Sequence, residues 1–439
     1  MSPAQRAARA LGLIVAAAVV AHAPVVRADQ ASRSREAFYG TQSQLCRAAL
    51  GADTAECNVD GYDLSAANVD EYEASWVHRA IGLQRQLDEH APLRDALFPH
   101  THNSFNSAAY TPSLSRLDHN QLLSLTDQLR LDMRAIEIDI HRAPSMTEGR
   151  VGVVACHAQE AGGTIVHPGC TNEEPLSFYL AELRTWLDAN PGELVLLYLE
   201  NNLDGDPAAH DEAARNIEQI LGDRVYRTPR KKPCKAMPYD DSRAQILETA
   251  QVLIVGNCGP GAWGTWVHER GPKWDESGND AGDDYSCAAD RARHAYDDEI
   301  TRRYEDRTWL SAMAASEGGI TKAEMAAMVG CGVNLVGFDQ LHPDDARLET
   351  LVWSWAPGEP SAPGCALQGA DGRWSSRPCG EEHPVACFTG GAWTVSARAV
   401  TFGDADEQCA FAAPWNGWEN GRLLAAGGGD VWVAWSDAE

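Results

Sequence analysis

The sequence lacks long apolar runs beyond its first residues, zinc-type cysteine patterns and an excess of positive charge. After the N-terminal segment, no stretch approaches the ~20 apolar residues of a membrane-spanning helix. No Cys-x-x-Cys pair or cysteine–histidine spacing resembles a zinc site, so a bound metal should have oxygen ligands. With 36 Lys and Arg against 63 Asp and Glu, the formal net charge is −27, which argues against nucleic acid as a partner.

The N-terminus has the pattern of a secretory signal. Arg6 and Arg9 precede a short apolar run over residues 11–20, and Val26 and Ala28 supply small residues for a cut before Asp29. We therefore predict a signal peptide over residues 1–28 and a secreted protein, extracellular or periplasmic.

Twelve cysteines, an even number, fit an oxidising compartment. Spacing favours two local disulfides, Cys46–Cys57 and Cys156–Cys170, and the second would brace the loop after His157. Four further cysteines leave three connectivities that the sequence does not separate: Cys234, Cys258, Cys287 and Cys331.

The remaining chain divides into three segments. Residues 29–90 are predicted to form a mostly helical extension, with apolar residues at helical spacing from Val77 to Leu87. Residues 91–346 alternate short apolar runs with amphipathic helices, which is the signature of an α/β fold. Residues 347–439 are rich in Trp, Gly, Pro and Cys and are predicted to form a small, disulfide-rich, β-rich module.

Six strand–helix alternations are visible in the middle segment. They include a helix stopped by Pro191-Gly192, a buried-type strand over residues 252–255 and a capping box formed by Thr321 and Glu324. We predict a TIM-type (β/α)8 barrel, closed and either regular or distorted, whose remaining strands lie unrecognised between about residues 258 and 310.

Four apolar runs end in polar residues that the fold could bring together in one active site. The carboxyl ends of parallel barrel strands converge at the mouth where catalysis takes place. Two histidines suit acid–base catalysis, and an oxygen-rich set suits a hard cation such as Ca²⁺. This combination predicts phosphodiester cleavage, and its residues are His102, Asn103, Glu137, Asp139, His157 and Glu200.

Glu137 and Asp139 are two apart on a predicted strand, so their carboxylates project to one face. A buried, unpaired carboxylate pair would be costly, and a cation between them would compensate. The alternative is a solvated pair on an edge strand. His100 and His141 are nearby rivals of the two candidate histidines, and we interpret both as structural or supporting.

Over about residues 95–345, the set His102-Asn103, Glu137-x-Asp139, His157 and Glu200-Asn201 resembles the catalytic domain of calcium-dependent phosphatidylinositol-specific phospholipases C. The resemblance implies that Asn103, Glu137, Asp139 and Glu200 bind Ca²⁺. It also implies that His102 and His157 form the acid–base pair, with His157 protonating the leaving group. The inositol 2-hydroxyl would attack phosphorus, giving diacylglycerol and a cyclic inositol phosphate.

Neighbouring families differ at single positions. The metal-independent bacterial branch has an Arg two residues after the strand Asp, where this chain has His141, which favours the calcium type. Glycerophosphodiesterases usually have Arg-Gly after the first His, where this chain has Asn103-Ser104. Cleavage of a glycerophosphodiester at the same metal site is the alternative function. In a departure from the lipases, Ala158 follows His157 in place of their common Gly. A second alternative is an inactive secreted glycan-binding protein.

A lipase of this type needs transient contact with a membrane interface. Three tryptophans in a Gly-rich stretch, Trp263, Trp266 and Trp274, either serve that contact or form a packed loop core. A basic island over residues 227–232 is either a solvated loop or a contact for an anionic headgroup.

The C-terminal segment resembles a C-type lectin-like domain with its halves in swapped order. Trp353 to Cys387, with Glu359-Pro360, resembles the second half, and Phe402 to Trp435 resembles the first. The resemblance implies the disulfides Cys365–Cys379 and Cys387–Cys409. Ser361 stands where an Asn usually follows the Glu-Pro pair, so we favour a stapled module over a glycan-binding one.

Overall fold

The computed structural model describes residues 66–110, 118–145, 149–157, 159–161, 164–166, 170, 173–227, 235–271, 274, 285–293, 299–309, 319–427 and 429–438. The predicted signal peptide, Cys46, Cys57 and Cys234 lie outside these ranges. Within them, no helix is both long and apolar enough to cross a membrane.

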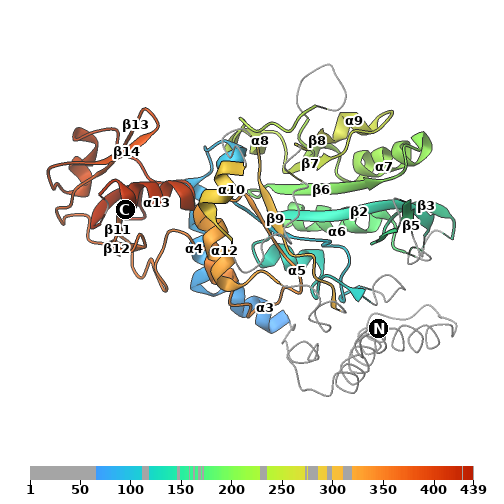
Figure 1. Cartoon of the computed structure of the whole chain (residues 1–439), viewed down its shortest axis with the longest axis horizontal. Helices are drawn as coiled ribbons and strands as arrows, with labels where there is room; N and C mark the ends of the chain where they lie inside the picture. Colours follow the sequence, from blue (N-terminus) through green and yellow to red (C-terminus); the bar gives the residue numbers. More distant parts are fainter. Residues whose placement is uncertain are drawn as a thin grey trace.

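An eight-stranded sheet forms the centre of the molecule (Figure 1). Seven parallel strands follow the order β8-β7-β6-β2-β1-β10-β9, and β3 pairs antiparallel with β2. Most of their residues are buried, which explains the near-continuous Val, Leu and Ile runs. The strands are β1 (Phe98–Thr101), β2 (Ala135–Pro144), β3 (Val151–Ala155), β6 (Val195–Asn202), β7 (Val252–Gly256), β8 (His268–Glu269), β9 (Arg302–Tyr304) and β10 (Leu335–Phe338).

The prediction of a closed barrel was too strong. Among the described residues, β8 and β9 end the path and no pairing joins them, so the parallel strands form a curled, open half-barrel. Both end strands lie in the stretch between residues 258 and 310. They have two and three residues, mostly charged, and therefore make no apolar run that a sequence pattern could reveal.

Helices cover the sheet, and their ends follow capping chemistry. The predicted capping box is present: Thr321 accepts from the Glu324 amide, the Glu324 side chain accepts from the Thr321 amide, and the helix ends at Gly332 with φ 84°. The helices are α3 (Ala66–Glu73), α4 (Trp76–Leu87), α5 (Leu125–Arg130), α6 (Leu176–Ala189), α7 (Pro207–Ile220), α8 (Arg243–Leu247), α9 (Trp263–Trp266), α10 (Cys287–Arg293), α12 (Lys322–Cys331) and α13 (Gly417–Ala425), with 3₁₀ turns η3 (Leu93–Asp95), η5 (Gly222–Arg224), η8 (Leu348–Leu351) and η9 (Phe402–Glu407).

The C-terminal module packs directly on the α/β domain. One hydrophobic cluster contains Trp355 and Trp374 of the module together with Met325 and Met328 of α12. Gln84 of α4 donates to the Leu351 carbonyl at 2.9 Å and accepts from the Trp353 and Ser354 amides. The module's strands are β11 (Cys365–Gln368), β12 (Trp374–Arg377), β13 (Ala386–Thr389), β14 (Ala392–Val395) and β15 (Val431–Ser436), and a separate hairpin joins β4 (Gln159–Ala161) to β5 (Thr164–Val166).

The predicted disulfide Cys156–Cys170 is present, as are the two that the lectin resemblance implies, Cys365–Cys379 and Cys387–Cys409. The fourth, Cys287–Cys331, falls among the connectivities that the sequence left open. Trp263, Trp266 and Trp274 are all buried. They form packed core, and their side chains are not available to a membrane surface.

One buried carboxylate joins the N-terminal helices to the sheet. Asp132, between α5 and β2, accepts from the Tyr72 hydroxyl at 2.9 Å and from Arg85 Nη1 at 2.8 Å. Its Oδ2 also lies 2.8 Å from Nδ1 of His78. Burial alone would raise the pKa of Asp132, but Arg85, His78 and Arg134 hold it well below its usual range.

Folding lowers the pKa of Asp132, so the ionised carboxylate stabilises the folded protein. This contribution is complete above about pH 4 and declines as the pH falls toward the pKa of Asp132 in the folded protein. We expect Asp132→Asn to lower the free energy of unfolding by about 3 kcal/mol near neutral pH. Denaturant unfolding measured from pH 7 to pH 2.5 should show the difference in free energy of unfolding between wild type and variant becoming smaller. Asp188→Asn, at a half-exposed carboxylate paired with Arg184, is the control and should cost less than about 1 kcal/mol. A difference in free energy of unfolding between wild type and Asp132→Asn that stays constant with pH would contradict this prediction.

Candidate active site

Strand β2 separates an apolar face from an acidic one. Ile136, Ile138 and Ile140 pack into the hydrophobic cluster beneath α6, while Glu137 and Asp139 point to the opposite side. Both carboxylates are buried, with 1% and 4% of their residue surfaces exposed. Alternation along one strand therefore places two acidic groups inside the curl of the sheet.

Glu200 completes an acidic cluster. It lies directly opposite Asp139 in the parallel pairing of β2 with β6. Carboxylate oxygens of Glu137, Asp139 and Glu200 lie within 4.8 Å of one another. The structure thus brings together all three carboxylates that the sequence predicted.

His102 follows β1 and is held by Asp339, which follows β10. The His102 Nδ1 and the Asp339 Oδ2 are 3.1 Å apart. Asp339 is itself fixed, because it accepts from Gln121 Nε2 at 2.9 Å and from the Arg307 amide at 2.6 Å. Burial alone would lower the pKa of His102, but the Asp339 and Glu137 carboxylates outweigh burial and raise it to about 9.

Asn103 lies between His102 and the carboxylates, in a left-handed conformation with φ 45°. In the amide orientation that gives each atom a partner, its nitrogen donates to Asp139 Oδ2 at 2.9 Å and its oxygen accepts from His102 Nε2 at 3.2 Å. In the opposite orientation the amide oxygen faces the Asp139 carboxylate. Two facing oxygens repel unless a cation lies between them. The Asn103 amide can therefore reverse its orientation when a cation binds, so that its oxygen becomes a ligand.

Arg302 is the main residue that sequence reasoning missed. From β9, its Nη2 lies 2.5 Å from Glu137 Oε2, and its Nε donates to His100 Nε2 at 3.2 Å. Its guanidinium carbon lies 4.0 Å from the centre of the Tyr304 ring. Nothing in the sequence around Arg302 marks it as part of this cluster.

The charges of the cluster fit a divalent cation. Three carboxylates and one guanidinium leave a formal net charge of −2 (−3 plus +1). Burial raises the pKa of Glu137, but Arg302 and His102 more than offset this and hold it well below its usual range. Burial raises the pKa of Asp139 well above its usual value, and the negative charge of Glu200 adds to the effect. Arg302 therefore compensates Glu137, whereas the negative charges of Asp139 and Glu200 are not compensated. The carboxylate oxygens of these two residues are hard donors of the kind that Ca²⁺ prefers.

The remaining histidines occupy different surroundings. His157, just after β3, has its pKa lowered to about 4 by burial and by the charge on His102. His100 contacts the Ala135 carbonyl, and burial lowers its pKa to about 4. His141 Nε2 lies 3.3 Å from the Asn202 amide nitrogen. His157 thus lies within the electrostatic reach of His102, while His100 and His141 contact neighbouring strands.

Comparison with known proteins identifies the family. The family model described as the Rv2075c PI-PLC-like domain matches residues 61–345. The chain belongs to the Rv2075c PI-PLC-like family. It is 38% identical over 419 residues, 88% of this chain and 85% of theirs, to uncharacterized proteins of two strains of Mycobacterium tuberculosis, MT2135 and Rv2075c.

Solved structures similar to this chain include two phosphatidylinositol-specific phospholipases C. That of Listeria monocytogenes is 13% identical, with 60% of this chain and 95% of the other covered and a TM-score of 0.40. That of Staphylococcus aureus is 12% identical, with 63% and 98% covered and a TM-score of 0.43. The family match over residues 61–345 gives this chain a phospholipase C-like domain.

Arg302 should weaken cation binding, because its positive charge lies beside the acidic cluster. We expect Arg302→Gln to bind Ca²⁺ roughly tenfold more tightly than wild type, since the cluster charge becomes −3. Isothermal titration calorimetry measures this directly. Arg303→Gln is the matched control, because Arg303 is on the same strand and pairs with Asp290 instead. Weaker Ca²⁺ binding by a folded Arg302→Gln protein would contradict this prediction.

Proposed function

We propose that this chain is a secreted, calcium-dependent phosphodiesterase that cleaves phosphatidylinositol, or a related inositol phospholipid, to diacylglycerol and a cyclic inositol phosphate. One observation carries the proposal: the His102–Asp339 pair lies beside a largely buried carboxylate cluster of formal net charge −2, in a PI-PLC-like domain. Phosphodiester cleavage needs both a proton acceptor and compensation for charge on phosphorus.

Four residues would hold the cation: Asn103, Glu137, Asp139 and Glu200. When bound, Ca²⁺ supplies charge stabilisation for a phosphoryl oxygen and lowers the pKa of a coordinated hydroxyl. Arg302 holds Glu137 in place and adds a fixed positive charge at the same mouth. With a divalent cation bound, the formal charge of the cluster would be zero, and the cation and Arg302 together would attract an anionic phosphodiester to this acidic chain.

His102 and His157 divide the proton transfers. Asp339 fixes the His102 ring through Nδ1, so Nε2 faces Asn103 and the mouth of the site. His102 takes the proton of the inositol 2-hydroxyl as its oxygen bonds to phosphorus, which requires the neutral ring. A cation beside Glu137 would oppose the carboxylates that raise the His102 pKa to about 9 and so favour that neutral form. The bond from phosphorus to the glycerol oxygen breaks, and His157 gives that oxygen a proton. The negative charge of the bound phosphodiester, together with loss of the charge on His102, would raise the His157 pKa from about 4 and favour its protonated form.

The roles of the two histidines can be distinguished with substrates whose leaving groups differ in their need for a proton. With phosphatidylinositol, His102→Ala and His157→Ala should each lose about a hundredfold or more in kcat. A p-nitrophenyl inositol phosphodiester has a leaving group that needs no proton, so His157→Ala should recover most of its activity on that substrate. His102→Ala should not recover. Recovery of His102→Ala alone would reverse the two roles.

Phosphorus NMR of the mature protein with phosphatidylinositol micelles tests the reaction itself. A cyclic inositol phosphate resonance should appear with Ca²⁺, vanish with a chelator and be absent for Glu200→Gln. Cleavage of glycerophosphoinositol or glycerophosphocholine without turnover of the lipid would move the function to a glycerophosphodiesterase. No turnover of any phosphodiester would favour the inactive glycan-binding alternative.

A further inference from the structure

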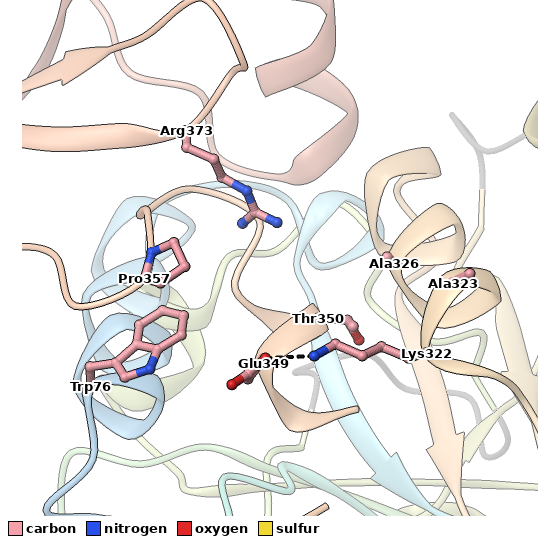
Figure 2. Close-up of a pocket in the computed structure, with 8 residues that line it drawn as sticks. All are labelled: Trp76, Lys322, Ala323, Ala326, Glu349, Thr350, Pro357 and Arg373. Carbon is pink, nitrogen blue, oxygen red and sulfur yellow. Dashed lines mark hydrogen bonds and ion pairs between the residues drawn. The ribbon is translucent and has the colours of Figure 1, made fainter. Parts of the chain in front are cut away.

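A cavity of about 470 Å³ lies where the C-terminal module meets the helices of the α/β domain (Figure 2). Its walls come from α4, α12, η8 and two loops of the module, and it shares no residue with the candidate active site. Volumes of this size are typical of sites for small ligands.

An arginine without an acidic partner points into this cavity. Figure 2 shows the Arg373 guanidinium directed from the module into the open space. In the part of the chain that the structure describes, it forms no ion pair, and its side chain donates only to the Val352 carbonyl. Burial lowers the pKa of Arg373, and Asp371 offsets only part of the effect. A half-buried guanidinium with unused N–H groups is a site for an anion, which it can hold in a bidentate pair.

The opposite walls are suited to a ring. The Trp76 indole and the Pro357 ring lie together on one side, and Ala323 and Ala326 of α12 face the cavity from the other (Figure 2). The Trp76 indole N–H has no hydrogen-bond acceptor among the described residues. A flat ring with polar edges would cover the apolar walls and give this N–H a partner.

Hydrogen-bonding groups line the lower rim. Lys322 Nζ lies 2.6 Å from Glu349 Oε2, and both side chains are half-exposed. Together they offer a donor and an acceptor to hydroxyl groups, whereas a purely apolar ligand would cover the remaining Arg373 N–H groups without giving them an acceptor.

We propose that this cavity binds a cyclic polyol with an anionic group, such as a uronic acid or a sugar phosphate. The anionic group pairs with Arg373, the ring packs on Trp76, and hydroxyls contact Lys322 and Glu349. Carboxylate and phosphate share this chemistry, and the experiment separates them.

Isothermal titration calorimetry of the full mature chain, with a calcium chelator present, tests the site with four probes. Glucuronate and glucose 6-phosphate are expected to bind, and glucose and inorganic phosphate to bind at least about tenfold more weakly. Comparing the two anionic sugars shows which anion the site prefers.

Arg373→Gln should weaken binding of the anionic sugars roughly tenfold, and Arg373→Lys less. Trp76→Leu tests the other wall independently, in case loss of the Arg373–Val352 contact disturbs the module. Arg377→Gln, at a half-exposed arginine on β12 outside the cavity, and His102→Ala in the candidate active site are controls that should bind normally.

Four results would overturn the proposal: no binding of either anionic sugar, phosphate binding as tightly as glucose 6-phosphate, glucose binding as tightly as glucuronate, or loss of binding in His102→Ala.

Discussion

The structure of the candidate site depends on how three clustered carboxylates, two of them buried, are kept together. Glu137, Asp139 and Glu200 come from two neighbouring strands and would repel one another strongly at their separation of less than 4.8 Å. Arg302 neutralises one of the three charges from the far end of the sheet. The formal charge of −2 that remains would favour a divalent cation, and it requires a fold rigid enough to hold the carboxylates together.

The curled sheet supplies that rigidity. The alternation along β2 anchors Ile136, Ile138 and Ile140 in a core against α6, so the acidic face cannot rotate outward. At Gly337 of β10, an added Cβ would lie 2.5 Å from the Tyr304 Cβ and 2.8 Å from the His100 ring. The absence of a side chain there lets both rings approach the cluster. Asp339 then sets the orientation of His102, and the Cys156–Cys170 disulfide closes the loop after His157.

Much of this arrangement could be predicted from local patterns. Strands β2, β6, β7 and β10 contain apolar runs, and polar residues at or near the ends of predicted strands located Asn103, Glu137, Asp139 and Glu200. The same rule applies to Asp339, which directly follows the apolar run of β10 and could have been included. Arg302 could not be found this way, because its destination depends on the pairing of β9 with β10, a contact between distant segments. The open sheet escaped prediction for a related reason, since its end strands are too short to leave a pattern.

The central claim is that the cluster of net charge −2 accepts one divalent cation beside a fixed arginine. Calcium anomalous scattering from crystals of the mature protein, grown with Ca²⁺ and an inositol phosphate, tests it most directly. The account predicts one ion bound to oxygens of Asn103, Glu137, Asp139 and Glu200, with Arg302 still paired to Glu137. A fully ordered site with the phosphate bound and no anomalous peak among these carboxylates would contradict it.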